Sequence, residues 1–252
     1  GAFYALSLVA TAAPGDRAYT RQRRAAEILR KLGTTHPEHP GIWHYLIHAH
    51  DYELLADSGQ SVANRYSGVA PNVPHALHMP SHIYVRLGQW QEAAGANERS
   101  AAAARNDSER LHPGITGFEE LHAWDYWLYA ELQLADDRQA KALMDRVAAV
   151  QAIQPGNFPA AYALAAMPGR FALERRDWAA AAKVRLHRSI AADDPMRWVS
   201  WLVDFSRAVG LARSGDADGA RVEIGRIKVV HDQLVADHNP VWAEQAQIQY
   251  LE

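Results

Sequence analysis

The sequence predicts an all-α fold, and three features of its pattern support this prediction. Apolar residues recur at spacings of three and four, as at Ile83 and Leu87, which is typical of helices with one buried face. No stretch alternates apolar and polar residues as a half-buried strand does. Turn-forming residues recur about every fifteen residues, so we expect helices of ~12–20 residues joined by short turns.

Composition limits the classes of function. The 252 residues are 48% hydrophobic and 22% charged, which is typical of a globular protein with a sizeable core. A net charge of −3 gives no indication of a nucleic-acid partner. The sequence contains no apolar run of about 18 residues, so no membrane span is predicted. Without cysteine there are no disulfides, thiolate nucleophiles or cysteine-ligated metals. A signal peptide is not recognisable, so a cytoplasmic location is only the default.

Proline, glycine, asparagine and aspartate divide the chain into the expected helices. Proline cannot continue a helix it interrupts, and glycine or asparagine commonly follows a helix end. In order, the predicted turns are Pro14-Gly15, Pro37, Pro71, Gly88, Asn106-Asp107, Pro155-Gly156, Asp193-Asp194-Pro195, Gly215-Asp216 and Asn239-Pro240. The apolar first residues and the segment 240–252 are helical in pattern, so both ends look like parts of a longer protein.

A repeat underlies this division. Pro37 and Pro71 are 34 residues apart, as are Pro40 and Pro74, and Leu77–Ser100 is the clearest helix–turn–helix unit. The turn of that unit recurs three times, each time five residues before an alanine that we expect at the packing surface between the two helices. The aligned alanines are Ala93, Ala140, Ala181 and Ala220.

These units resemble the tetratricopeptide repeat (TPR) over nearly the whole chain. The resemblance implies a right-handed solenoid of antiparallel helix pairs. Residues 1–252 would form a single solenoid of about five units, with incomplete units at both ends and an inserted loop at 107–117. The segments 39–51 and 74–84 resemble longer, mostly uncharacterised bacterial TPR proteins, of which this chain would be a fragment.

Histidines occupy a regular place in the repeat. TPR solenoids imply that positions 2, 5, 9 and 12 of the first helix face a concave groove. Counted from Pro40, these positions hold His44, His48 and Asp51 in the first unit. Counted from Pro74, they hold His75, His78 and His82 in the second.

Two H-x-x-x-H pairs, one in each of two neighbouring helices, are a reasonable geometry for a metal site. Residues i and i+4 share a helix face, and packed helices lie ~8–10 Å apart, so four imidazoles can converge. We predict His44, His48, His78 and His82 as ligands of a divalent transition metal (Zn, Fe, Cu or Mn), with Asp51 as a further ligand. Polar groove lining and repeat packing remain alternatives, whereas His50 faces the packing side and is expected to be structural.

The later units place other polar residues in the same register. In the third unit these positions hold His122, Asp125 and Tyr129. In the fourth, Met167-Pro168-Gly169-Arg170 repeats Met79-Pro80-Ser81-His82, so Arg170 stands where His82 stood. We expect His75, His122, Asp125, Tyr129 and Arg170 to contact a ligand, and Pro80 and Pro168 to kink their helices.

Two functions of different classes are compatible with these residues. The first is a binding protein whose histidine-rich groove holds a metal ion, a small acidic ligand, a peptide or a protein. The alternative is a metal-dependent enzyme, in which the metal activates water and Asp51 or Asp125 is the catalytic base. A purely structural scaffold is less favoured because the polar residues share one face. The sequence contains no familiar hydrolase, nucleotide-binding or zinc-protease motif. Motifs therefore do not distinguish the binding protein from the enzyme.

Overall fold

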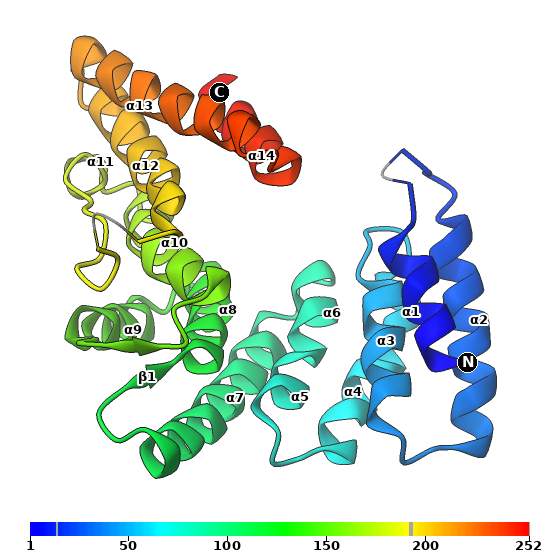
Figure 1. Cartoon of the computed structure of the whole chain (residues 1–252). Helices are drawn as coiled ribbons and strands as arrows, with labels where there is room; N and C mark the ends of the chain where they lie inside the picture. Colours follow the sequence, from blue (N-terminus) through cyan, green and yellow to red (C-terminus); the bar gives the residue numbers. More distant parts are fainter. Residues whose placement is uncertain (14, 192–193, 252) are drawn as a thin grey trace. The chain divides into compact units, whose positions relative to one another are not determined.

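The computed structural model describes residues 1–13, 15–191 and 194–251, and these residues are predominantly helical (Figure 1). The all-α prediction is therefore confirmed at the level of fold class. Two short strands that were not expected, β1 (Thr116–Gly117) and β2 (Ile153–Gln154), pair in parallel. The chain divides into two compact units, Gly1–Asp107 and Ser108–Glu252, called unit 1 and unit 2 below.

The described residues of unit 1, 1–13 and 15–107, form six α-helices, one 3-10 helix and most of a seventh α-helix. They are α1 (Ala2–Ala10), α2 (Thr20–Thr35), α3 (Pro40–His50), η1 (Ala56–Gly59), α4 (Gln60–Val69), α5 (Pro74–His78), α6 (Pro80–Arg86) and α7 (Trp90–Leu111). Helices α1, α2 and α3 pack in succession, and α4 packs on α6. Leu29, Leu46 and Ile47 are fully buried in this unit.

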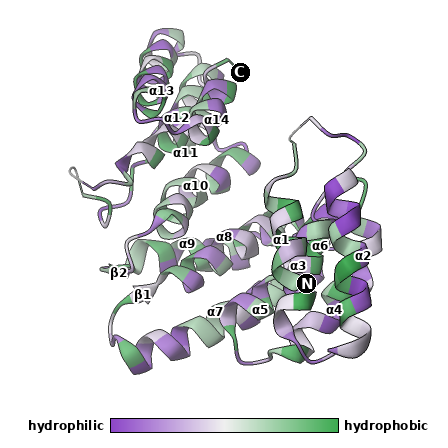
Figure 2. Cartoon of the chain, turned by 45° about the vertical axis from the view of Figure 1, so that its right-hand side comes forward, coloured by the Kyte–Doolittle hydropathy of each residue, from purple (hydrophilic) through white to green (hydrophobic). Residues whose placement is uncertain are grey.

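Unit 2 repeats the pattern of paired helices. Its helices are α8 (Phe118–Gln133), α9 (Asp137–Ala149), α10 (Phe158–Glu174), α11 (Trp178–Ala181), η2 (Arg197–Val199), α12 (Ser200–Arg213), α13 (Ala217–Ala236) and α14 (Pro240–Leu251). Helix α10 packs on α8 and α12, α12 on α13, and α13 on α14. Most helices carry both hydrophilic and hydrophobic residues (Figure 2), as is typical of helices that bury one face.

The turns between paired helices share one backbone conformation. The residue five before each aligned alanine has a positive φ: Gly88 (68°), Ala135 (56°), Arg176 (55°) and Gly215 (90°). The next N–H bonds to the carbonyl five residues back, from Gln89 to Tyr84, Asp136 to Glu131, Asp177 to Ala172 and Asp216 to Leu211, at 2.9–3.0 Å. This left-handed turn satisfies a carbonyl at the end of the first helix. A fifth such turn, at His238 with φ 54°, precedes α14.

The four aligned alanines are buried as the repeat predicts. Ala93, Ala140 and Ala181 have no exposed surface, and Ala220 is 5% exposed. Small side chains here allow the second helix of each pair to approach the first closely. Bulkier side chains at these positions would separate the two helices.

The two prolines expected to kink helices behave differently. Pro80 is the first residue of α6, so α5 and α6 are separate helices that meet at Met79. Proline is well tolerated at this first position, because the N–H it lacks has no partner within a helix. Pro168 lies inside α10, which is one continuous helix from Phe158 to Glu174.

The turn at Asn106-Asp107 and the start of the loop 107–117 were wrongly predicted. Helix α7 continues to Leu111, so the irregular segment begins at His112 and ends in β1. An alanine-rich stretch precedes Asn106, and one Asn or Asp costs a helix only ~0.7 kcal/mol relative to alanine, too little to end it. Within the predicted turns, Pro14 and Asp193 lie outside the described residues.

Candidate metal centre

Five histidines of unit 1 lie together. His44 and His48 are one turn apart on α3, His75 and His78 are on α5, and His82 is on α6. Taken in the order 44–48–82–78–75–44, neighbouring ring centroids are 4.9, 5.9, 5.0, 5.8 and 5.0 Å apart. The structure thus brings all four predicted ligands and His75 into one closed ring, which we call the five-histidine cluster.

The orientation of His78 is set by α7. Its Nδ1 lies 2.6 Å from Asn97 Oδ1, and Asn97 Nδ2 donates to the carbonyl of Ala93 at 2.8 Å. Because the amide NH₂ is used by Ala93, Oδ1 is the acceptor, and His78 Nδ1 must carry the proton. Neutral His78 therefore presents a lone pair on Nε2.

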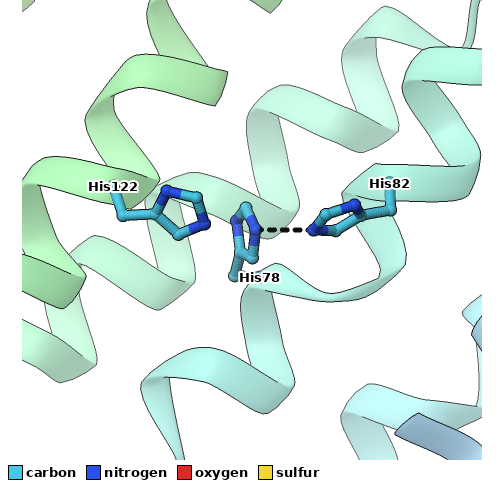
Figure 3. A group of neighbouring side chains, drawn as sticks. All are labelled: His78, His82 and His122. Atoms are coloured by element: carbon cyan, nitrogen blue, oxygen red, sulfur yellow. Dashed lines mark hydrogen bonds between the residues drawn. The ribbon is translucent and has the colours of Figure 1, made fainter. Parts of the chain in front are cut away.

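The same holds for His82. Its Nδ1 lies 2.9 Å from Asp51 Oδ2, and a carboxylate can only accept, so Nδ1 is the donor. His82 Nε2 lies 3.1 Å from His78 Nε2, as the dashed line in Figure 3 shows. The two Nε2 atoms are hydrogen-bonded to each other, so one of them carries the shared proton. A metal ion bound by both Nε2 atoms would take the place of that proton.

Asp51 orients His82 and is itself held in place. It follows α3 directly, and Arg86 on α6 donates from Nε to its Oδ1 at 2.8 Å. Burial would raise the pKa of Asp51, but the hydrogen bonds from His82 and Arg86 outweigh it and lower the pKa. Asp51 is therefore an ionised carboxylate with each oxygen engaged. This geometry favours an orienting role over the predicted roles of metal ligand or catalytic base.

His44 and His48 form the second predicted pair, with Nε2 atoms 3.0 Å apart. Burial lowers the pKa of His44 to about 4, assisted by His48, His75 and His82. Burial also lowers the pKa of His48, with a further contribution from His82. Both imidazoles are therefore neutral at pH 7, the state in which they can donate a lone pair to a metal.

Within each pair, the nitrogen separation suits two ligands of one metal ion. At metal–nitrogen distances of ~2.0–2.1 Å, ligand nitrogens are about 3.3 Å apart in a tetrahedral site and about 2.9 Å apart when adjacent in an octahedral one. The observed 3.0 and 3.1 Å fall between these values. His78 and His82 belong to a group of histidines whose ring nitrogens could hold a metal ion.

The remaining predicted ligand-binding residues belong to unit 2. His122, the third imidazole labelled in Figure 3, is on α8 and packs edge-on against Tyr126, with centroids 5.4 Å apart. Asp125, 5% exposed, forms an ion pair with Arg170, which also donates to the Asp125 carbonyl at 3.3 Å. The Arg170 guanidinium lies 5.5 Å from the ring centre of Tyr129. Asp125, Tyr129 and Arg170 are therefore brought together by α8 and α10.

Asn97 and Arg86 are site residues that the sequence did not single out. The signal for Asn97 was one polar residue four positions after the buried Ala93, on the same face of α7. For Arg86 no signal existed, because its contact with Asp51 joins residues from separate elements.

The structural role expected of His50 is confirmed. Its side chain is 2% exposed, its Nδ1 lies 2.6 Å from the Leu46 carbonyl, and its Nε2 lies 3.0 Å from Arg30 Nη2. Both ring nitrogens are thus satisfied by protein groups from outside the cluster.

A scan of protein-family models and searches of curated proteins and solved structures found no match to this chain. In the part of the chain that the structure describes, no helix is long and apolar enough to span a membrane. The function must accordingly be argued from the chemistry of the site.

Proposed function

We propose that unit 1 binds a divalent transition-metal ion through the five-histidine cluster. Its ligands are Nε2 of His78 and His82, and Nε2 of His44 and His48 from α3 close on the same ion when it binds. The observation that carries the proposal is the 3.1 Å approach of His78 Nε2 and His82 Nε2 while both Nδ1 atoms donate elsewhere. Bonding of the second ring nitrogen to an amide or carboxylate oxygen is how proteins usually orient metal-binding histidines.

Zinc fits the donor set best. Imidazole suits Zn, Cu and Fe, whereas Mn prefers oxygen ligands, and Asp51 has both oxygens engaged. Four nitrogen donors satisfy the tetrahedral preference of Zn²⁺. His44 and His48 give up no proton on binding at pH 7, since both are already neutral.

The experiment is metal titration of the full chain after removal of metal by a chelator. We expect one equivalent of Zn²⁺ to bind, and the double variant His48→Ala/His82→Ala to bind at least 100-fold more weakly. The control variant His36→Ala/His39→Ala removes two exposed histidines of the same unit and should bind as the parent does. Absence of stoichiometric binding by the parent, or equal losses in both variants, would overturn the proposal. If the cluster binds only protons, the parent will show no stoichiometric zinc binding.

The solenoid and its partners form the second part of the proposal. The left-handed turns and the buried alanines five residues later support TPR-like helix pairs in both units. In this arrangement the first helices line a concave groove, which would receive a peptide, a protein or a small acidic ligand beside the metal.

One observation favours an enzyme as the second candidate. His75 closes the ring of imidazoles, next to both His44 and His78, and is not one of the four proposed ligands. An imidazole in that place can accept a proton from water polarised by the metal. Hydrolysis of 4-nitrophenyl acetate by the zinc-loaded chain, with His75→Gln as the variant, tests this: equal rates with and without zinc would contradict it.

A further inference from the structure

Four arginines of unit 2 line one cavity of ≈ 470 Å³. They come from four different places in the chain. Arg185 follows α11, Arg197 begins η2, Arg207 is on α12 and Arg226 is on α13. This concentration of positive charge is local, because the whole chain has a net charge of −3.

Two carboxylates belong to the same group of side chains but do not neutralise it. Glu223, 3% exposed, accepts from Arg207 at 2.6 Å and from Arg226 at 3.1 Å. With Asp204 also ionised, the four arginines and two carboxylates have a formal charge of +2. The arginines therefore exceed the acidic groups available to pair with them.

Asp204 is the unusual member of the group. It is 7% exposed, it lines the cavity, and no hydrogen bond joins it to another residue in the part of the chain that the structure describes. Burial, together with the charge of Glu223, raises the pKa of Asp204 to about 6, although Arg207, Arg226 and Arg197 oppose this shift. A ligand or a proton in the cavity can satisfy a carboxyl in this position.

The rest of the cavity wall is apolar. Val203 is buried on α12, and Leu186 and Val230 extend the apolar surface beside the arginines. Guanidinium groups bind carboxylate, phosphate or sulfonate oxygens in pairs of hydrogen bonds. A wall of this kind adjoining several guanidiniums suits a molecule with an anionic head and an apolar body.

We propose that this cavity binds a small organic anion. Its head lies against Arg185, Arg197 and Arg226, its body lies against Val203 and Val230, and the protonated carboxyl of Asp204 donates a hydrogen bond to the head. The site is separate from the five-histidine cluster, and it needs no metal.

The first experiment uses calorimetric titration with benzenesulfonate, which stays ionised from pH 5 to 8. We expect the parent chain to bind it, and the variant Arg185→Gln/Arg197→Gln to bind at least tenfold more weakly. The control variant Arg138→Gln/Arg221→Gln removes the same charge from exposed positions elsewhere in unit 2 and should retain affinity. If the parent does not bind, or if the control loses as much affinity as the cavity variant, the proposal is wrong.

The second experiment tests Asp204. Because a protonated carboxyl donates to the anion and an ionised one repels it, affinity should rise as the pH falls from 7.5 to 5. The variant Asp204→Asn is neutral and can donate at every pH, so it should bind more tightly at pH 7.5 and lose most of this pH dependence. An unchanged pH dependence in Asp204→Asn would refute the role of Asp204.

Further titrations define the head and the body of the ligand. Benzoate and phenyl phosphate identify the preferred anionic group, and sulfate and benzyl alcohol measure head and body alone. Binding of benzyl alcohol as tight as that of benzenesulfonate would overturn the proposal, since it would make the arginines irrelevant.

Discussion

The two units satisfy His82 and Arg170, which the sequence aligns, in different ways. In unit 2, Arg170 occupies the position that His82 has in unit 1, and it pairs with the buried Asp125 of a neighbouring helix. In unit 1, His82 also pairs with an aspartate, through Nδ1, but its Nε2 then faces the Nε2 of His78. The ion pair of unit 2 joins opposite charges, whereas in unit 1 two imidazoles share a hydrogen bond between their Nε2 atoms.

This difference teaches how a binding site can be told from a structural ion pair. A buried polar group with a complementary partner in the protein stabilises the fold and needs no ligand. Two imidazoles whose Nδ1 atoms are both engaged place their Nε2 atoms where a metal ion can take the place of the proton they share. Variants that change one member of each arrangement test this difference.

The largest effect is expected from Asp125→Asn in unit 2. This change leaves the guanidinium of Arg170 without its carboxylate, and breaking a buried pair from one side costs about 3 kcal/mol of stability. Urea unfolding followed by circular dichroism measures the loss. The double variant Asp125→Leu/Arg170→Met, which removes both charges, should be much closer to the parent. A loss below about 1 kcal/mol in Asp125→Asn would show that the pair is not structural.

A smaller effect is expected from Asp51→Asn in unit 1. The amide is nearly the same size, but its bond to His82 Nδ1 is weaker, since the acceptor has lost its charge. Zinc affinity should fall by ~10–100-fold, as is typical when a residue that orients a histidine ligand is changed. Competition with a chromogenic chelator measures it. Asp57→Asn, an exposed change in the same unit, is the matched control, and equal affinities in both variants would contradict the orienting role.

The smallest effect concerns the turns, in which the two units agree. Gly88 in unit 1 and Arg176 in unit 2 both have a left-handed backbone, with φ of 68° and 55°. Non-glycine residues pay about 1 kcal/mol for this conformation, so Gly88→Ala should destabilise the chain and Arg176→Gly should stabilise it, each by ~1 kcal/mol. Thermal unfolding tests this, and a shift of the same sign in both variants would show that the turns are not equivalent.

Much of the candidate metal centre was predictable because its spacing is local. The i, i+4 spacing places His44 beside His48 and His78 near His82, and the repeat of 34 residues places one pair in the helix following the other. The structure has both pairs with Nε2 atoms at 3.0 and 3.1 Å. His75 was expected to contact a ligand in the groove, and the structure places its ring between those of His44 and His78.

Other features could not be predicted, because they join residues from separate elements. Asn97 reaches His78 from α7, and Arg86 reaches Asp51 across 35 residues of sequence. The continuation of α7 through Asn106 depends on the balance of many small helix propensities, which no single residue reveals. The cavity of unit 2 uses arginines from four places, none of which stands out in the sequence.

The sequence by itself determined the helical fold class, the places of most turns, the buried alanines and the faces on which the histidines lie. Each of these follows from backbone conformation and side-chain periodicity within one or two helices. Only the tertiary structure decided which ring nitrogen of each histidine is already engaged, that Asp51 holds His82, and that arginines surround Asp204. These properties depend on how side chains from distant segments pack, since a hydrogen bond is made or lost within a few tenths of an ångström.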